Sequence, residues 1–249
     1  SSRWWHGPVT VYGEWPDQPA HVVPFFTSMM DARQVKRAAD IAARKSLSAT
    51  PLRVLFSGRL APEKRVDALL EAVKLVSERG VELEVAIVGD GSERQRLEAL
   101  AEQFGISERV QFVGALPFDE GLTWYEWAHC LVLPSLNSEG WPKVIAEGMC
   151  HGLLCIGVEH GQVPAMLRGR GILLKTGTAQ EIASTLHEIA LSPVKFEPVM
   201  RRASEWSRQY SLEGLRDALS DLLSRRWNVP LDKQASFGER PNVPAKAER

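Results

Sequence analysis

From residue 53 onward, short apolar runs alternate along the chain with segments whose apolar residues recur at helical spacing. The runs are apolar on both faces, which indicates strands that are covered on both sides. Strands that are joined by helices pair in parallel. We therefore predict an α/β fold, a doubly wound, Rossmann-like parallel sheet of about six strands. The six runs span residues 53–58, 83–89, 109–114, 130–135, 153–158 and 171–175.

The two ends of the chain depart from this alternation. Residues 1–50 hold two strand-like stretches and a helix, which we interpret as the remnant of a preceding domain and its linker. Residues 51–200 form the predicted sheet domain, and residues 201–228 form amphipathic closing helices with a stripe of leucines. Residues 229–249 are Pro-rich and charged, so we expect disorder there. Because the chain lacks an initiating Met, we expect it to be a piece of a longer protein.

Charge and cysteine content exclude several classes of function. The chain has 30 basic and 31 acidic residues, so no overall field favours nucleic acid or an anionic membrane. No apolar run reaches the length of a bilayer span, so we predict no transmembrane segment. The three cysteines, Cys130, Cys150 and Cys155, lack the spacing of a zinc site or a disulfide framework. We expect them to be buried apolar side chains of a cytoplasmic protein.

The loop after the first predicted strand carries a possible phosphate site. In parallel sheets, ligands bind at the carboxyl ends of the strands, near the point where the strand order reverses. In "SGRLAPEK", Gly58 permits close approach of the backbone, Arg59 offers a planar fork, and Lys64 supplies a compact charge. Together these residues suit a diphosphate. The alternative is that Arg59 and Lys64 are surface residues that pair with Glu63 or Asp67.

The stretch "EGWPKVIAE", residues 139–147, combines a helix start with two carboxylates. Pro142 suits the first helical position and Gly152 suits the residue after the end, so we predict a helix over 142–151. Its N-terminus would present free amides to an anion. Glu139 and Glu147 could accept hydrogen bonds from vicinal sugar hydroxyls. The alternatives are an exposed helix residue for Glu147 and an acid favoured by the helix dipole for Glu139.

Four loop sequences, each after a predicted strand, share their order with a known family. They are "GRLAPEK", "IVGDGSE", "VQFVGALP" and "PSLNSEGWPKVIAEGM". Together they resemble the nucleotide-sugar-binding, C-terminal half of the family-4 retaining glycosyltransferases (glycosyl transferases group 1), which have the GT-B fold. The resemblance covers roughly residues 50–190, and the seven residues between Glu139 and Glu147 match the family's pair of acids.

The resemblance implies roles for individual residues. Arg59 and Lys64 would hold the donor diphosphate and balance its charge as the glycosidic bond breaks. Glu147 would bind the ribose hydroxyls, and Glu139 would contact the transferred sugar, so that Arg59, Lys64 and Glu139 carry the catalysis. The further donor-binding residues that it implies are Gly58, Gly89, Asp90, Gly91, Gly114, Ala115, Leu116, Gly140, Trp141, Pro142, Lys143 and Val144.

The resemblance also implies an activity and its partners. The enzyme would be a hexosyltransferase that moves a sugar from a UDP- or GDP-sugar to a glycan, lipid or small-molecule acceptor. It would need no metal or other cofactor. The acceptor site would lie in an N-terminal domain that is missing from this chain, so we expect the chain alone to be inactive. That domain could also hold the protein at the membrane periphery.

Two departures from the family pattern leave the donor sugar open. Leu154 stands where the family usually has Pro, and Ala165 stands where it has an acid. Both changes touch the wall that would face the sugar. Two alternatives to a glycosyltransferase stay open as well. One is a non-catalytic module that binds sugar nucleotides, and the other is an epimerase or phosphorylase with the GT-B fold.

Overall fold

A computed structural model describes residues 7–13, 17–137 and 139–227, and its centre is a six-stranded parallel sheet. The strand order is β5-β4-β3-β6-β7-β8, and every neighbouring pair is parallel. The predicted fold and all six predicted strands are confirmed. The strands are β3 (Leu52–Ser57), β4 (Leu83–Val88), β5 (Val110–Gly114), β6 (Cys130–Leu133), β7 (Leu154–Val158) and β8 (Ile172–Leu174).

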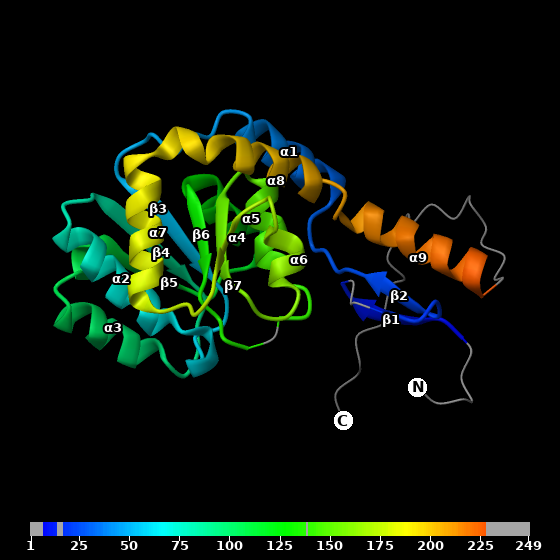
Figure 1. The fold of residues 1–249 in the computed structure, drawn as a ribbon, viewed down its shortest axis with the longest axis horizontal. Coiled ribbons are helices and arrows are strands. Elements are labelled where there is room, and N and C mark those ends of the chain that lie inside the picture. The colour runs from blue at the N-terminus through cyan, green and yellow to red at the C-terminus, as the bar shows by residue number, and fades with distance from the viewer. Residues whose placement is uncertain (1–6, 14–16, 138, 228–249) are drawn as a thin grey trace, which may run out of the picture.

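Helices cover both faces of this sheet. One face carries α2 (Val66–Glu78), α3 (Arg94–Gln103) and α7 (Ala179–Leu191). The opposite face carries α1 (Ala32–Ala42), α4 (Phe118–Trp127), α5 (Lys143–Cys150), α6 (Val163–Leu167) and α8 (Glu197–Ser207). Figure 1 shows α2, α3 and α7 on one side of the strands and α4, α5 and α6 on the other. Short 3-10 turns lie at Pro62–Lys64, Ser107–Arg109 and Pro193–Lys195.

Strand side chains divide between the two faces because successive residues point in opposite directions. In β3, Val54 and Phe56 join the core beneath α2 and α7, whereas Leu55 joins the core beneath α4 and α5. The sheet is therefore apolar on both sides, as the sequence pattern required. The three cysteines are buried as predicted and form no disulfide with one another, and burial raises the pKa of each thiol.

The upstream segment contributes to this layered unit before residue 51. Strands β1 (Val9–Tyr12) and β2 (Val22–Phe25) form a separate parallel pair. Helix α1 follows and packs against α5 and α8, with Val35 and Ala38 buried in the core. The packing of the sheet unit thus extends upstream of the predicted domain start. The predicted tail, residues 229–249, lies outside the described residues.

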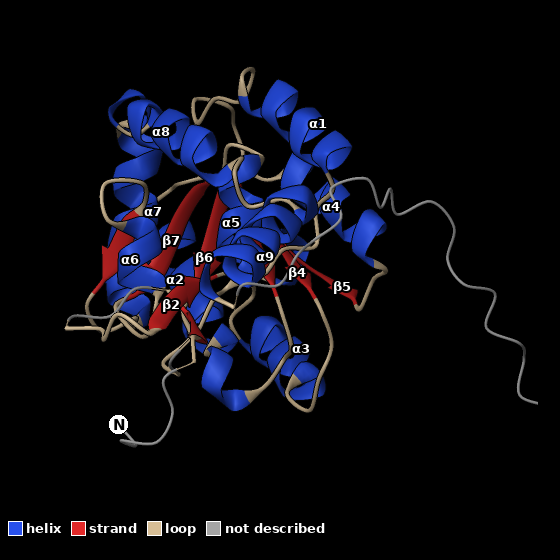
Figure 2. Cartoon of the chain, turned by 90° about the vertical axis from the view of Figure 1, so that its right-hand side faces the viewer, coloured by secondary structure: helices blue, strands red, loops and turns tan. Residues whose placement is uncertain are grey.

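The two closing helices differ in how they pack against the sheet unit. Helix α8 is packed against α5, whereas α9 (Leu212–Arg226) extends away from the sheet beside the β1–β2 pair (Figures 1 and 2). In the predicted leucine stripe, Leu222 is buried but Leu212 and Leu219 are exposed. Among the described residues, no helix is both long and apolar enough to cross a membrane. The rest of the described chain therefore leaves Leu212 and Leu219 of α9 largely uncovered.

Lys45, which follows α1, is hydrogen-bonded to the C-terminal end of α4. Its ammonium donates to the carbonyl oxygens of Tyr125, Glu126 and Ala128, at 2.8, 2.9 and 2.6 Å. These carbonyls lie at the C-terminus of α4, where helix groups lack intrahelical partners and a cation is favoured. Burial lowers the pKa of Lys45 to about 8, so the side chain is still protonated at pH 7.

Replacing Lys45 by methionine is expected to destabilise the fold by about 2 kcal/mol, because hydrogen bonds from a charged group are lost. Urea denaturation at pH 7 measures the change. The matched control is Lys36→Met on α1, whose ammonium is exposed and pairs with Asp40 at 3.2 Å; its expected cost is below about 0.5 kcal/mol. Equal costs for the two variants would contradict the assigned role of Lys45.

Candidate functional site

The strand order reverses between β3 and β6, and this places two loops side by side. The chain runs from β3 outward to β4 and β5, then returns to β6 on the other side of β3. The loops that leave the carboxyl ends of β3 and β6 therefore flank one crevice, which is where ligands bind in open parallel sheets. Lys64 follows β3, and Glu139 follows β6.

Lys64 and Glu139 join these two loops directly. The ammonium of Lys64 donates to the carboxylate of Glu139, and the two side chains are only 19% and 20% exposed. The hydroxyl of Ser135 lies 3.2 Å from the Glu139 carboxylate and 3.3 Å from the carbonyl oxygen of Glu63. The amide of Leu136 also donates to that carbonyl, at 3.2 Å. The basic loop and the acidic loop thus form one continuous site.

Arg59 is placed differently from Lys64. Its guanidinium is 72% exposed and pairs with Glu63 at 3.0 Å, which is the alternative that we considered for it from the sequence. Lys64 pairs with neither of the acids that we considered, since Asp67 pairs with Arg65 instead. The structure therefore brings Lys64 to Glu139 and leaves Arg59 exposed beside Glu63.

Glycines let three loops meet closely at this edge of the sheet. Gly89 has a φ of +134°, and a Cβ there would lie 1.9 Å from the carbonyl oxygen of Gly58. The amide of Gly89 donates to the carbonyl of Gly114 at 2.8 Å. A Cβ at Gly91 would lie 2.2 Å from the carbonyl oxygen of Leu60. Only glycine fits such backbone contacts.

The residues that follow these glycines complete the same edge. Asp90 accepts from the amide of Gly91 at 2.7 Å and pairs with Arg94 at 3.3 Å, so its carboxylate is already engaged. Ala115 and Leu116 continue from the end of β5, and Leu116 packs against the core beneath α4 and α5. The predicted stretches 89–91 and 114–116 therefore lie at the carboxyl edge of the sheet.

Helix α5 begins one residue later than predicted. Pro142 is the N-cap and Lys143 is the first helical residue, because Pro142 has extended backbone angles of −70° and 94°. The side chain of Pro142 provides no capping hydrogen bond to this end of the helix. The first-turn amides of a helix have no intrahelical acceptor, so those of Lys143 and Val144 are suited to an anion. Gly152, with a φ of +74°, follows the last turn as predicted.

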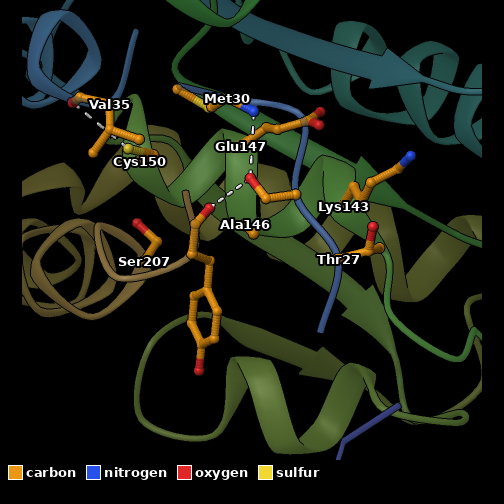
Figure 3. Close-up of a pocket in the computed structure, with 10 residues that line it drawn as sticks. Thr27, Met30, Val35, Lys143, Ala146, Glu147, Cys150 and Ser207 are labelled. Carbon is orange, nitrogen blue, oxygen red and sulfur yellow. Dashed lines mark hydrogen bonds between the residues drawn. The ribbon is translucent and has the colours of Figure 1, made fainter. Parts of the chain in front are cut away.

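Glu147 lies buried in α5, and the alternative of an exposed helix residue is wrong. It is 8% exposed, and Tyr125 from α4 donates to its carboxylate at 2.8 Å. Burial raises the pKa of Glu147, while the Tyr125 hydroxyl and the Lys143 charge act in the opposite direction. Glu147 and Lys143, together with Thr27 and Met30, line a cavity of about 10 Å³. Figure 3 shows these four residues around it. That volume holds about one water molecule.

Trp141 turns its side chain away from the acid pair. Its ring packs 4.8 Å from Tyr210, 6.0 Å from Phe26 and 6.4 Å from Trp206, measured between centroids. This aromatic cluster joins the Glu139 loop to the segment before α1 and to α8. Neighbouring Gly140 lies against the ring of Tyr12, which would be 3.1 Å from a Cβ at this position. Because its ring packs in this cluster, Trp141 can contribute to the candidate site only through its backbone.

Two site residues were not found from the sequence. Ser135 and Tyr125 contact Glu139 and Glu147, respectively, through side-chain hydroxyls. Ser135 ends a predicted strand, so its place at the carboxyl edge was a usable signal. Tyr125 lies near the C-terminus of α4, 22 residues before Glu147, and no spacing rule joins two such positions.

A parallel sheet with a basic loop after β3 and an acid pair around α5 defines one half of a GT-B glycosyltransferase fold. The chain belongs to the family "Glycosyl transferases group 1", which matches residues 38–208. Among solved structures, the chain is similar to HepE of Anabaena in complex with UDP, with a TM-score of 0.64 and 19% identity. The match covers 82% of this chain and 57% of that one.

Two curated relatives show how much of a whole protein is present. The putative colanic acid biosynthesis glycosyltransferase WcaL of Escherichia coli (strain K12) is 28% identical over 63% of this chain and 41% of its own length. The D-inositol 3-phosphate glycosyltransferase of Streptomyces bingchenggensis (strain BCW-1) is 29% identical over 85% of this chain and 48% of its own length. The chain thus spans less than half the length of these relatives.

Proposed function

We propose that this chain is the donor-binding part of a retaining, family-4 hexosyltransferase. It binds a UDP- or GDP-sugar, and the whole protein transfers the sugar to a glycan, lipid or small-molecule acceptor. The observation that carries this proposal is the contact between Lys64 and Glu139 across the crevice at the strand-order reversal. It places a cation for the diphosphate beside a carboxylate for the sugar.

The Lys64–Glu139 pair suggests how a donor is received. Without ligand, the two charges neutralise each other in a partly buried site. Diphosphate oxygens compete with Glu139 for the ammonium of Lys64, and the released carboxylate can then accept from hydroxyls of the sugar. The free amides at the start of α5 add partial positive charge near the leaving diphosphate. Binding and departure of the diphosphate therefore use the same groups.

We propose that the remaining part of the protein supplies the acceptor site and covers an apolar surface of this chain. Val9 and Tyr12 of β1 and Leu212 and Leu219 of α9 are exposed. A two-stranded parallel pair is not stable by itself, and single-sided apolar helices need a partner. The colanic acid and D-inositol 3-phosphate glycosyltransferases are each more than twice as long as their matched region. We expect no transfer by this chain alone. We also propose that the protein is cytoplasmic.

UDP is expected to stabilise this chain against heat. At a UDP concentration 100-fold above Kd the gain is about 2.7 kcal/mol, which corresponds to roughly 5 °C or more in Tm. Differential scanning fluorimetry with UDP and GDP measures it, and uridine at the same concentration is the control that lacks phosphate. No shift with either nucleotide, in a chain that is folded by circular dichroism, would overturn the proposed function.

We also propose that donor binding requires no metal ion. Lys64 and the start of α5 already place positive charge at the crevice. In the described part of the chain, no group of three or more His, Cys, Asp and Glu residues could hold a metal ion. The UDP-dependent rise in Tm is therefore expected to be unchanged by excess EDTA. Loss of the shift in EDTA, and its return with Mg²⁺, would contradict metal-free binding.

A further inference from the structure

Tyr125 and Glu147 form a buried polar pair between two helices of the sheet unit. Tyr125 is 4% exposed and Glu147 is 8% exposed, and the hydroxyl donates to Oε2 of the carboxylate at 2.8 Å. Tyr125 lies on α4, which follows β5, and Glu147 lies on α5, which follows β6. Among the described residues, the hydrogen bond to this carboxylate comes from Tyr125 and goes to Oε2. Oε2 is therefore engaged by Tyr125, and Glu147 lines the small cavity beside Thr27 and Met30.

Other residues hold Tyr125 in place. The ring stacks on His151 with centroids 5.5 Å apart and planes 28° apart. His151 itself lies at the end of α5, with Nδ1 2.8 Å from the backbone oxygen of Glu147. Lys45 anchors the tyrosine's backbone, since its ammonium donates to the Tyr125 carbonyl at 2.8 Å. The hydroxyl of Tyr125 thus has little freedom to leave the carboxylate.

The charge on Glu147 needs such a partner. Burial of a carboxylate raises its pKa and favours the neutral acid, and a hydrogen bond to the ionised form opposes this. Lys143, on the same helix, acts in the same direction as the Tyr125 hydroxyl. A neutral acid would carry a proton on one oxygen and would accept more weakly from the vicinal hydroxyls than the ionised carboxylate does. A purely structural contact would not require a buried charge here.

We propose that Tyr125 is a positioning residue that fixes the Glu147 carboxylate so that it accepts hydrogen bonds from the vicinal hydroxyls of the donor's ribose. This inference rests on the proposed function, because it assumes that the chain binds a nucleoside diphosphate. It assigns to Tyr125 the discrimination between ribose and deoxyribose. Tyr125 acts through Glu147 and does not itself touch the reacting atoms.

The test compares UDP with 2′-deoxy-UDP by isothermal titration calorimetry. The unaltered chain is expected to bind UDP about tenfold or more tightly than 2′-deoxy-UDP, because a hydrogen bond to a charged group is lost with the hydroxyl. Tyr125→Phe is expected to weaken UDP binding about tenfold and 2′-deoxy-UDP binding by less, because only the 3′-hydroxyl of that ligand is left for Glu147, so the ratio of the two affinities falls. Thr123→Ala, which removes an exposed hydroxyl from the same helix, is the control and keeps the ratio.

A double variant separates positioning from a general structural effect. If Tyr125 acts through Glu147, then Tyr125→Phe added to Glu147→Gln is expected to change UDP affinity by less than about twofold. An unchanged ratio in Tyr125→Phe, or a further tenfold loss in the Glu147→Gln background, overturns the proposal. Absence of UDP binding in the unaltered chain would instead refute the proposed function itself.

A second variant covers the case in which Tyr125→Phe does not fold. Glu147→Asp keeps the carboxylate and the tyrosine but shortens the acid by one methylene, which separates it from the hydroxyl. The ratio of UDP to 2′-deoxy-UDP affinity is expected to fall toward one in this variant as well. A ratio that stays at the value of the unaltered chain would overturn the role of Tyr125.

Discussion

Replacing Lys64 by alanine is expected to weaken UDP binding by about 10- to 100-fold while leaving uridine binding nearly unchanged. The loss corresponds to one or more charge-assisted hydrogen bonds, about 1.5–3 kcal/mol, and falls on the phosphate-containing ligand alone. Arg59→Ala is expected to act in the same direction. Isothermal titration calorimetry measures the affinity for UDP, and ligand-observed NMR measures the weaker binding of uridine.

Comparing UDP with uridine separates a loss of phosphate binding from a loss of fold stability. Lys64→Ala leaves the Glu139 carboxylate without its cation in a partly buried site, so the variant itself is expected to be less stable. A general loss of fold stability would weaken the binding of UDP and of uridine to the same extent. Lys74→Ala on α2, whose ammonium lies 3.9 Å from Glu78, is the matched control and keeps both affinities. Equal losses for UDP and uridine in Lys64→Ala would show that Lys64 does not face phosphate.

Replacing Gly89 by alanine is expected to destabilise the fold by about 3 kcal/mol or more. The new Cβ would lie 1.9 Å from the carbonyl oxygen of Gly58, so the loops after β3 and β4 must separate. The backbone of Gly89, at a φ of +134°, also disfavours any side chain. Overpacking and backbone strain each cost about 1–3 kcal/mol. Urea denaturation followed by circular dichroism measures the change in the free energy of unfolding.

Gly105 provides the control for the backbone effect alone. It has a φ of +67°, but a Cβ there would meet no atom within 4 Å. Gly105→Ala is therefore expected to cost only the left-handed penalty, about 1–2 kcal/mol. If Gly89→Ala costs no more than Gly105→Ala, the two loops do not cross as closely as the structure places them.

The fold was predictable because its signals are local. Runs that are apolar on both faces, separated by segments with helical spacing, allow few arrangements other than a covered parallel sheet. Gly152 marked a helix end because glycine adopts positive φ without a steric cost, and its φ is +74° here. The start of α5 was misplaced by one residue, because Pro142 suits both the N-cap and the first turn.

The site was predictable only in part. Loop order placed Lys64, Glu139 and Glu147 at one edge of the sheet, and the structure brings Lys64 and Glu139 into contact. The sequence could not separate Lys64 from Arg59, since both follow β3 and both have acids nearby. It also treated Glu147 as a possible surface residue, because burial depends on which neighbours cover a helix. The cover comes from the segment before α1 and from α4.

The sequence by itself determined the layered parallel sheet, the order of its loops and the charged residue types at their ends, because periodicity and turn residues act over a few neighbouring positions. Tertiary structure alone decided which charges meet. Lys64 reaches Glu139 across 75 residues, and Tyr125 reaches Glu147 across 22. Such pairs form where the sheet order reverses and where two helices pack on one face. Their distances depend on how distant segments fold against each other, which no local pattern encodes.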